Sequence, residues 1–274
     1  MKFFFADDST HKGVRAKMGK TVAFGGLLLD GSLLKELATR TDDILREFGV
    51  PEDEEVKWSP RKGSWIYSNL IGESRLACYS KILEAAAACE AKVVVAVCDS
   101  EMRNLKPEWG FERCVTYALE RVSTHLTNSD AEAVIICDRP SGGAKQAEEF
   151  LAAYAEHLES DLNHMMAESF AMNMLAAPSH MVRHLQIADL VVSITTAMVS
   201  GNTKWAGQYF DIVRQMMLCN TLGYVGGTGL KVYPDQLINL YHWIIGEDAY
   251  TKAGQMAGIK LPYEGYLYCE SDGT

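Results

Sequence analysis

Apolar and polar positions follow each other in blocks that predict strands first and then strands alternating with helices. An aromatic run at 3–6 and an apolar run at 21–29 are typical of β-strands, and their nearness favours antiparallel pairing. Segments 92–98 and 131–137 are almost wholly apolar, as in strands covered on both faces. We therefore predict an α/β fold, a mixed β-sheet flanked by α-helices in three layers.

Helical spacing of apolar residues appears in most of the remaining chain. Ser32 is expected to cap the first helix and Gly49 to end it. No repeat or linker interrupts the chain, so we expect a single domain over 1–274, with a core of about 2–200 and a C-terminal helical extension of about 201–274. The predicted helices cover 32–48, 64–91 (as one helix or two), 109–126, 144–173, 184–200, 207–219 and 235–246.

Composition narrows the class of protein. The 274 residues are 48% hydrophobic, enough for a large core, and the net charge of −10 excludes a bulk-basic nucleic-acid binder. Seven cysteines without a C-x-x-C pair indicate buried thiols in a reducing compartment. The apolar start is too short for a signal peptide, and 185–199 is too polar for a membrane span. We expect a cytoplasmic protein with no membrane partner.

Three aspartates stand where predicted strands end. Asp7 follows the first strand, Asp99 the strand at 92–98 and Asp138 the strand at 131–137. Open α/β sheets bind ligands at the carboxyl ends of their strands. The simpler interpretation is that each is a turn aspartate that binds local backbone. Spacing does not decide between Asp99 and Asp138.

Asp189 gives the sharpest signal of a site. It lies in Leu185-Gln-Ile-Ala-Asp189, within a helix that is apolar on nearly every face, and a carboxylate is almost never buried without a partner. Gln186 shares its helical face. A bound cation is one partner, and a salt bridge to Arg183 is the alternative. The acidic run 52–55, by contrast, favours a solvated loop when taken alone.

Several short motifs together resemble a known family. They are Asp7-Asp8-Ser9, Glu55-Val-Lys57, Asp138-Arg139, the helix around Leu185-Gln-Ile-Ala-Asp189, and Gly229-Leu-Lys-Val-Tyr-Pro234. In this order they are similar to the family catalogued as domain of unknown function 3800, over roughly residues 2–235. The family opens with Asp-Glu-Ser-Gly, whereas Asp8 and Thr10 replace its Glu and Gly here.

The resemblance implies a ribonuclease H-like fold and a divalent-metal nuclease site. Carried over by position, the catalytic and metal-binding residues are Asp7, Glu55, Asp138 and Asp189, which prefers Asp138 over Asp99. They would hold two Mg²⁺ or Mn²⁺ ions, with Asp7 bridging, because hard cations prefer carboxylate oxygens. The substrate implied is a nucleic acid, DNA or RNA.

Positive and polar side chains are expected to complete the site. Lys57 and Arg139 are candidates to bind phosphate, and Gln186 to fix Asp189 or a metal-bound water. Lys12, His11, His180 and His184 are weaker candidates, because such residues are usually ordinary surface groups.

Two other functions fit the same residues. A metal-dependent phosphoesterase acting on nucleotides or small phosphoesters needs the same acids, and the net negative charge suits a small substrate. A non-catalytic ribonuclease H-like binding module is the second alternative, because the residues after Asp7 depart from the family pattern. Walker-type nucleotide binding and a serine hydrolase lack their motifs.

Overall fold

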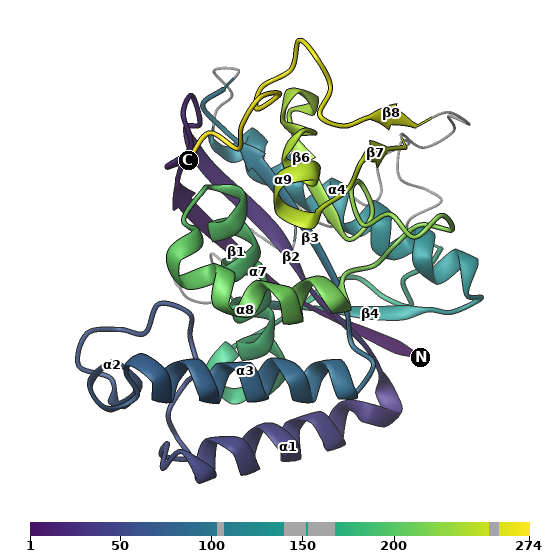
Figure 1. Cartoon of the computed structure of the whole chain (residues 1–274). Coiled ribbons are helices and arrows are strands. Elements are labelled where there is room, and N and C mark those ends of the chain that lie inside the picture. The colour runs from purple at the N-terminus through teal and green to yellow at the C-terminus, as the bar shows by residue number, and fades with distance from the viewer. Residues whose placement is uncertain (103–106, 140–151, 153–167, 252–257) are drawn as a thin grey trace. The chain divides into compact units, whose positions relative to one another are not determined.

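The structure, a computed structural model, describes residues 1–102, 107–139, 152, 168–251 and 258–274 (Figure 1). It is a mixed α/β fold in which helices flank a mostly parallel sheet. The strands predicted at 3–6, 21–29, 92–98 and 131–137 are confirmed. The predicted region 64–91 is two helices.

The described elements follow one another along the chain without long interruptions. The strands are β1 (Lys2–Lys12), β2 (Lys20–Asp30), β3 (Lys92–Asp99), β4 (Ala133–Asp138), β5 (Leu175–Ala177), β6 (Leu230–Tyr233), β7 (Ala249–Tyr250) and β8 (Ile259–Lys260). The α-helices are α1 (Leu34–Glu47), α2 (Trp65–Asn69), α3 (Gly72–Ala88), α4 (Pro107–Asn128), α7 (Arg183–Val199), α8 (Thr203–Met216) and α9 (Leu240–Ile245). Short 3-10 turns are η1 (Gly31–Leu33), η2 (Ser179–Met181) and η3 (Asp235–Leu237).

The chain divides into two compact units, each built from separate segments. The first unit comprises Met1–Asp7, Gly26–Lys92 and Leu119–Val191, and the second comprises Asp8–Gly25, Val93–Ala118 and Val192–Thr274. All four predicted catalytic acids belong to the first unit. The two units are described separately below.

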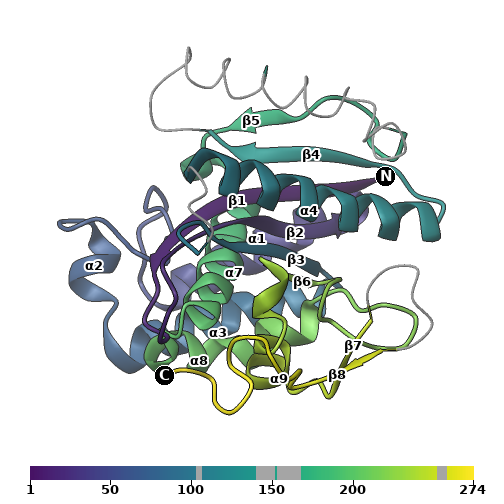
Figure 2. The ribbon, with the colours of Figure 1, turned by 90° about the horizontal axis from the view of Figure 1, so that it is seen from above.

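In the first unit, β4 lies between β1 and β5 and is parallel to both (Figure 2). The register pairs Ala6 with Cys137. One residue further along, Asp7 and Asp138 come at the carboxyl ends of adjacent parallel strands. Because neighbouring strands lie about 5 Å apart, this register brings the two aspartates to one sheet edge, as expected for a ligand site.

Helices cover the sheet of the first unit through apolar side chains. Phe5 packs against Leu185 and Ala188 of α7, together with Phe3 and Leu34. Phe3, Phe5 and Asp7 therefore share the face of β1 that meets α7, as the alternation along a strand predicts. Helices α1 and α3 lie side by side (Figure 1). Asp189 follows Ala188 on α7, so this packing brings its helix to the strand that carries Asp7.

The second unit contains the hairpin between β1 and β2 and the C-terminal segments. Strands β1 and β2 are neighbours joined by residues 13–19, a connection too short for a parallel crossover, so they are antiparallel. Strand β6 pairs with β3 in parallel. The buried Arg15 guanidinium donates to the carbonyls of Met198 and Val199, at the end of α7, and binds Asp272 near the C-terminus.

Several sequence expectations differ from the structure. Strands β5 to β8 were not predicted, because each has four residues or fewer and no room for a pattern. The C-terminal region expected to be helical thus also contributes a strand to the sheet. Most of the helix predicted at 144–173 lies outside the described residues, and 168–173 is not helical. Asp30, not Ser32, makes the cap of η1, by accepting from the Ser32 N–H.

Burial supports two further expectations. Five cysteines, at positions 78, 89, 98, 114 and 137, are buried. Within the described part of the chain, no helix has both the length and the apolar character needed to cross a membrane.

Gly26 tests the close approach of β1 and β2. An added Cβ would lie 1.8 Å from the Phe5 carbonyl oxygen, which belongs to backbone and cannot move aside. We expect Gly26→Ala to lower the free energy of unfolding by about 3 kcal/mol or more, measured by urea denaturation.

Gly207→Ala is the matched control. Gly207 lies inside α8, and its added Cβ would meet only the Met198 sulfur at 4.0 Å. The same chemical change should here raise stability by about 0.5–1 kcal/mol, because alanine favours helix. A neutral Gly26→Ala would contradict the strand geometry.

Candidate functional site

The centre of the candidate site is segment 51–58, which has no helix or strand but is fixed by side chains from elsewhere in the first unit. Three of these side chains, from the first two turns of α7, are three residues apart and share one face. The contacts are Arg183 Nη2 to Glu52 O (3.0 Å), Arg183 Nη1 to Glu54 O (3.0 Å), Val56 N to Gln186 Oε1 (3.1 Å), Trp58 N to Asp189 Oδ2 (2.6 Å) and Tyr79 Oη to Lys57 O (2.8 Å). Segment 51–58 is therefore not a solvated loop, although Glu52 and Asp53 are exposed.

The Lys57 ammonium lies among all four predicted acids. Its Nζ is 3.4 Å from Glu55 Oε1 and 3.4 Å from Asp138 Oδ2. Burial alone lowers the pKa of Lys57, but nearby negative charges outweigh burial and raise the pKa above its usual value. These charges belong, in order of their effect, to Asp189, Asp7, Asp138 and Glu55. The structure thus brings together acids from β1, β4, α7 and segment 51–58.

Ser179 links two of the acids and was missed in the sequence. Its hydroxyl lies 2.6 Å from Glu55 Oε1 and 3.0 Å from Asp138 Oδ2, while its backbone N–H donates to Asp138 Oδ1 at 3.0 Å. A hydroxyl has one proton, so it donates to one carboxylate at a time. The only sequence signal was the position of Ser179 after Pro178, between β5 and α7.

Asp189 has an altered acidity. Burial raises its pKa to about 6, against the hydrogen bond from the Trp58 N–H and the charge of Lys57, which lower it. The charges of Glu55 and Asp138 raise it further. A carboxyl group with such a pKa, close to other acids, is typical of functional sites.

Arg183 does not take the role that the alternative interpretation of Asp189 required. Its Nε donates to Asp42 at 2.7 Å, and its other nitrogens bind backbone and Gln186. Arg183 therefore anchors segment 51–58, and Asp189 has the Trp58 N–H and the Lys57 charge as its partners.

Asp99 and Asp138 have different surroundings. Asp99 is fully buried in the second unit, where it accepts from the backbone N–H groups of Gly19, Glu101 and Met102 at 3.1–3.2 Å. That is the turn-aspartate role. Asp138 instead faces Lys57 and Ser179.

Comparison with known proteins assigns no family. No family model and no curated protein matches the chain. The resemblance to domain of unknown function 3800 therefore remains a hypothesis, and the chemistry of the site is argued from its own residues.

The remaining predicted residues lie in varied settings. Gln186 is buried, and its amide binds Val56 N, Ser179 O and Arg183, so we infer that it positions segment 51–58. Arg139 is exposed directly after Asp138 and is accessible to a substrate. His184 stacks on Phe5, and its Nε2 lies 2.9 Å from the Leu34 carbonyl, which is a packing role.

The weaker candidates are not part of this cluster in the first unit. His11 and Lys12 belong to the second unit, at the end of β1. His180 is exposed in η2.

The donor chemistry of the cluster fits a divalent cation, since four carboxylates are the ligands that Mg²⁺ and Mn²⁺ prefer. As the side chains stand, no three acid, histidine or cysteine groups of the described residues are placed to hold a metal ion together. The Lys57 ammonium lies where a bound cation would meet the carboxylates. Metal binding would therefore require Lys57 to move.

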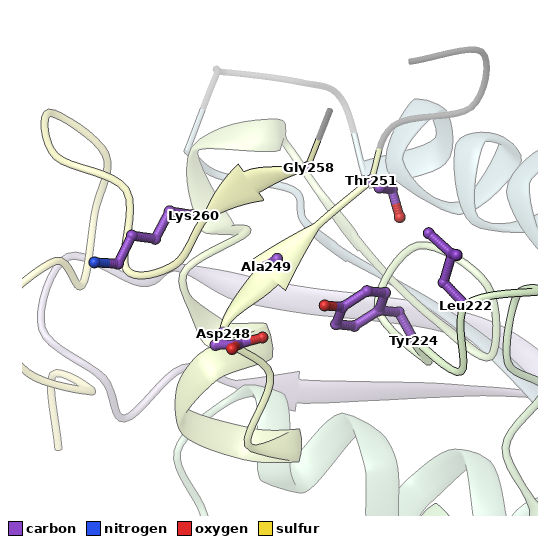
Figure 3. Close-up of a pocket in the computed structure, with 7 residues that line it drawn as sticks. All are labelled: Leu222, Tyr224, Asp248, Ala249, Thr251, Gly258 and Lys260. Carbon is purple, nitrogen blue, oxygen red and sulfur yellow. The ribbon is translucent and has the colours of Figure 1, made fainter. Parts of the chain in front are cut away.

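A pocket of about 390 Å³ lies in the second unit. It is lined by Leu222, Tyr224, Asp248, Thr251 and Lys260, among others, and by none of the predicted site residues. Figure 3 shows the Lys260 side chain pointing away from Tyr224 and Leu222. Its polar groups do not converge, so we assign it no chemistry.

The raised pKa of Asp189 predicts a pH dependence of stability. Between about pH 4 and pH 6 the folded chain binds more protons at this residue than the unfolded chain, so stability falls as pH rises through this window. Asp189→Asn removes this effect. The wild-type free energy of unfolding, relative to the variant, should fall by up to about 3 kcal/mol between pH 4 and pH 7.

Urea denaturation of both proteins at several pH values measures this difference. Asp53→Asn, which alters an exposed acid of the same segment, is the control and should follow the wild type. A difference that stays constant or increases with pH would show that Asp189 is not buried among acids.

Proposed function

We propose that this chain is a divalent-metal-dependent nuclease that hydrolyses phosphodiester bonds. The observation that carries the proposal is the set of four carboxylates around one cation position, supplied by four separate segments of the first unit. Such a set is costly to bury and suits a charged ligand.

The fold supports the same proposal. Strands β1 and β4 are parallel neighbours, so Asp7 and Asp138 share one sheet edge. This placement is what the ribonuclease H-like fold and the resemblance to domain of unknown function 3800 lead us to expect of a metal site.

Asp7, Glu55, Asp138 and Asp189 would hold Mg²⁺ or Mn²⁺. When bound, a pair of such ions stabilises charge on the attacking and leaving oxygens of a phosphodiester. Ser179 keeps Glu55 and Asp138 together, and the bonds from Asp189 and Gln186 to segment 51–58 fix Glu55 from the backbone side.

The phosphate group would be bound by cations close to the acids. Arg139 is exposed beside Asp138, and Lys57 would become available once it leaves the carboxylates. A protein of net charge −10 needs such local cations to approach nucleic acid. The same net charge favours a second candidate, a phosphoesterase acting on nucleotides or small phosphoesters.

A binding module without catalysis is the third candidate. The observation in its favour is the Lys57 ammonium itself, which already pairs with Glu55 and Asp138. In that case the cluster would be a structural ion-pair network and would not exchange its ammonium for a metal.

Substitution of the two strand-end acids tests the proposal. Asp7→Asn and Asp138→Asn should each lower Mn²⁺-dependent cleavage about 100-fold or more, because each removes a charge that the metal requires. Cleavage is measured on single-stranded RNA, single-stranded DNA and a chromogenic phosphodiester, which separates nuclease from phosphoesterase.

Asp8→Asn is the control, since Asp8 is the exposed acid next to Asp7. It should keep wild-type cleavage, and circular dichroism should show that all three variants fold. Full cleavage by both the Asp7 and Asp138 variants would overturn the assignment of the site. A wild type inactive on every substrate but able to bind Mn²⁺ would favour a binding module.

A further inference from the structure

Lys57 is held loosely by its acidic partners. Its two contacts with Glu55 and Asp138 are 3.4 Å long, whereas hydrogen bonds between charged groups are usually about 2.7–2.9 Å. Its side chain is 27% exposed, so a path to solvent is open. The ammonium is therefore attracted by the cluster as a whole and is not locked to one carboxylate.

The backbone of Lys57, in contrast, is fixed. Tyr79 binds its carbonyl, Gln186 binds the N–H of Val56, and Asp189 binds the N–H of Trp58. Motion of the lysine would thus be confined to its long, flexible side chain. Glu55 would stay in place while the ammonium moved.

One ammonium does not balance the negative charge of the cluster. Four carboxylates face Lys57, and Arg183 is engaged by Asp42 and by backbone carbonyls. Ser179 has one proton for the oxygens of two carboxylates. The cluster thus has more acceptors than its own cation and donors can satisfy, and a divalent ion would add the missing charge.

We propose that the Lys57 ammonium is a displaceable internal cation, which occupies the carboxylate cluster in the metal-free protein and swings into solvent when Mg²⁺ or Mn²⁺ enters. The inference rests on the proposed function, because it needs the acids to bind a metal. It adds that metal binding and exposure of Lys57 are one event. The released ammonium would then lie beside the metal site, where a substrate phosphate would be bound.

Metal affinity gives the first test. Calorimetric titration with Mn²⁺ alone compares the wild type with Lys57→Gln, which keeps a polar side chain and removes the competing charge. We expect the variant to bind Mn²⁺ about tenfold or more tightly, because one like charge is removed from the immediate surroundings of the ion. Circular dichroism checks that the variant is folded.

Chemical labelling of the wild type gives the second test and does not depend on any variant. An amine-acetylating reagent followed by mass spectrometry measures the modification rate of each lysine. The rate at Lys57 should rise several-fold when Mg²⁺ is added. Lys81 is the matched control, because its ion pair with Glu47 is on the surface, outside the cluster, and its rate should not change.

The outcomes separate the two proposals. Tighter binding by Lys57→Gln together with faster labelling of Lys57 supports displacement. Wild-type binding of Mn²⁺ with equal or weaker binding by the variant, or with unchanged labelling, overturns displacement and leaves the proposed function standing. Binding by the variant alone would show an ammonium that does not leave, and binding by neither protein would overturn both proposals.

Discussion

The candidate site depends on one constraint: buried negative charge must have a positive partner nearby. Asp7 and Asp138 are brought together by the register of two parallel strands, and Asp189 is carried to them by the packing of α7 on β1. Such convergence raises the cost of every carboxylate in turn. The Lys57 ammonium lowers this cost, and the position of segment 51–58 determines where that ammonium lies.

Helix α7 is the element that fixes segment 51–58. Arg183, Gln186 and Asp189 occupy one face at intervals of three residues and bind its backbone in the order of the chain. A segment without regular structure normally leaves its N–H and carbonyl groups to water. Here side chains of a helix replace water, so the position of Lys57 is determined by the helix and not by the local sequence.

The parts of the fold that the sequence predicted are those with a long pattern. Apolar runs of six or more residues gave the four long strands, and Asp189 was found because a charge inside an apolar helix violates that pattern. Short strands such as β5 carry too few residues to show alternation. Ser179 was missed for a related reason, since a serine after a proline is typical of any turn, and only the three-dimensional contact with Glu55 and Asp138 distinguishes it.

The choice between Asp99 and Asp138 shows what local sequence leaves open. Both follow an apolar strand, and the difference arises from what surrounds each carboxylate. Asp99 accepts three backbone N–H groups, which satisfy its charge at the turn where it lies. Asp138 has one such bond and otherwise faces a serine hydroxyl and an ammonium, both of which it shares with Glu55.

Folding alone gives no reason for such a cluster. Replacing buried ionic groups by well-packed apolar residues is often neutral or stabilising, so an underbalanced group of acids is not a means of gaining stability. The loose contacts of Lys57 lead to the same conclusion, because a structural ion pair would be expected to be shorter. A cluster that binds its own cation weakly, on a rigid backbone, is suited to exchange that cation for another. This property is what connects the electrostatics of the first unit to a metal-dependent function.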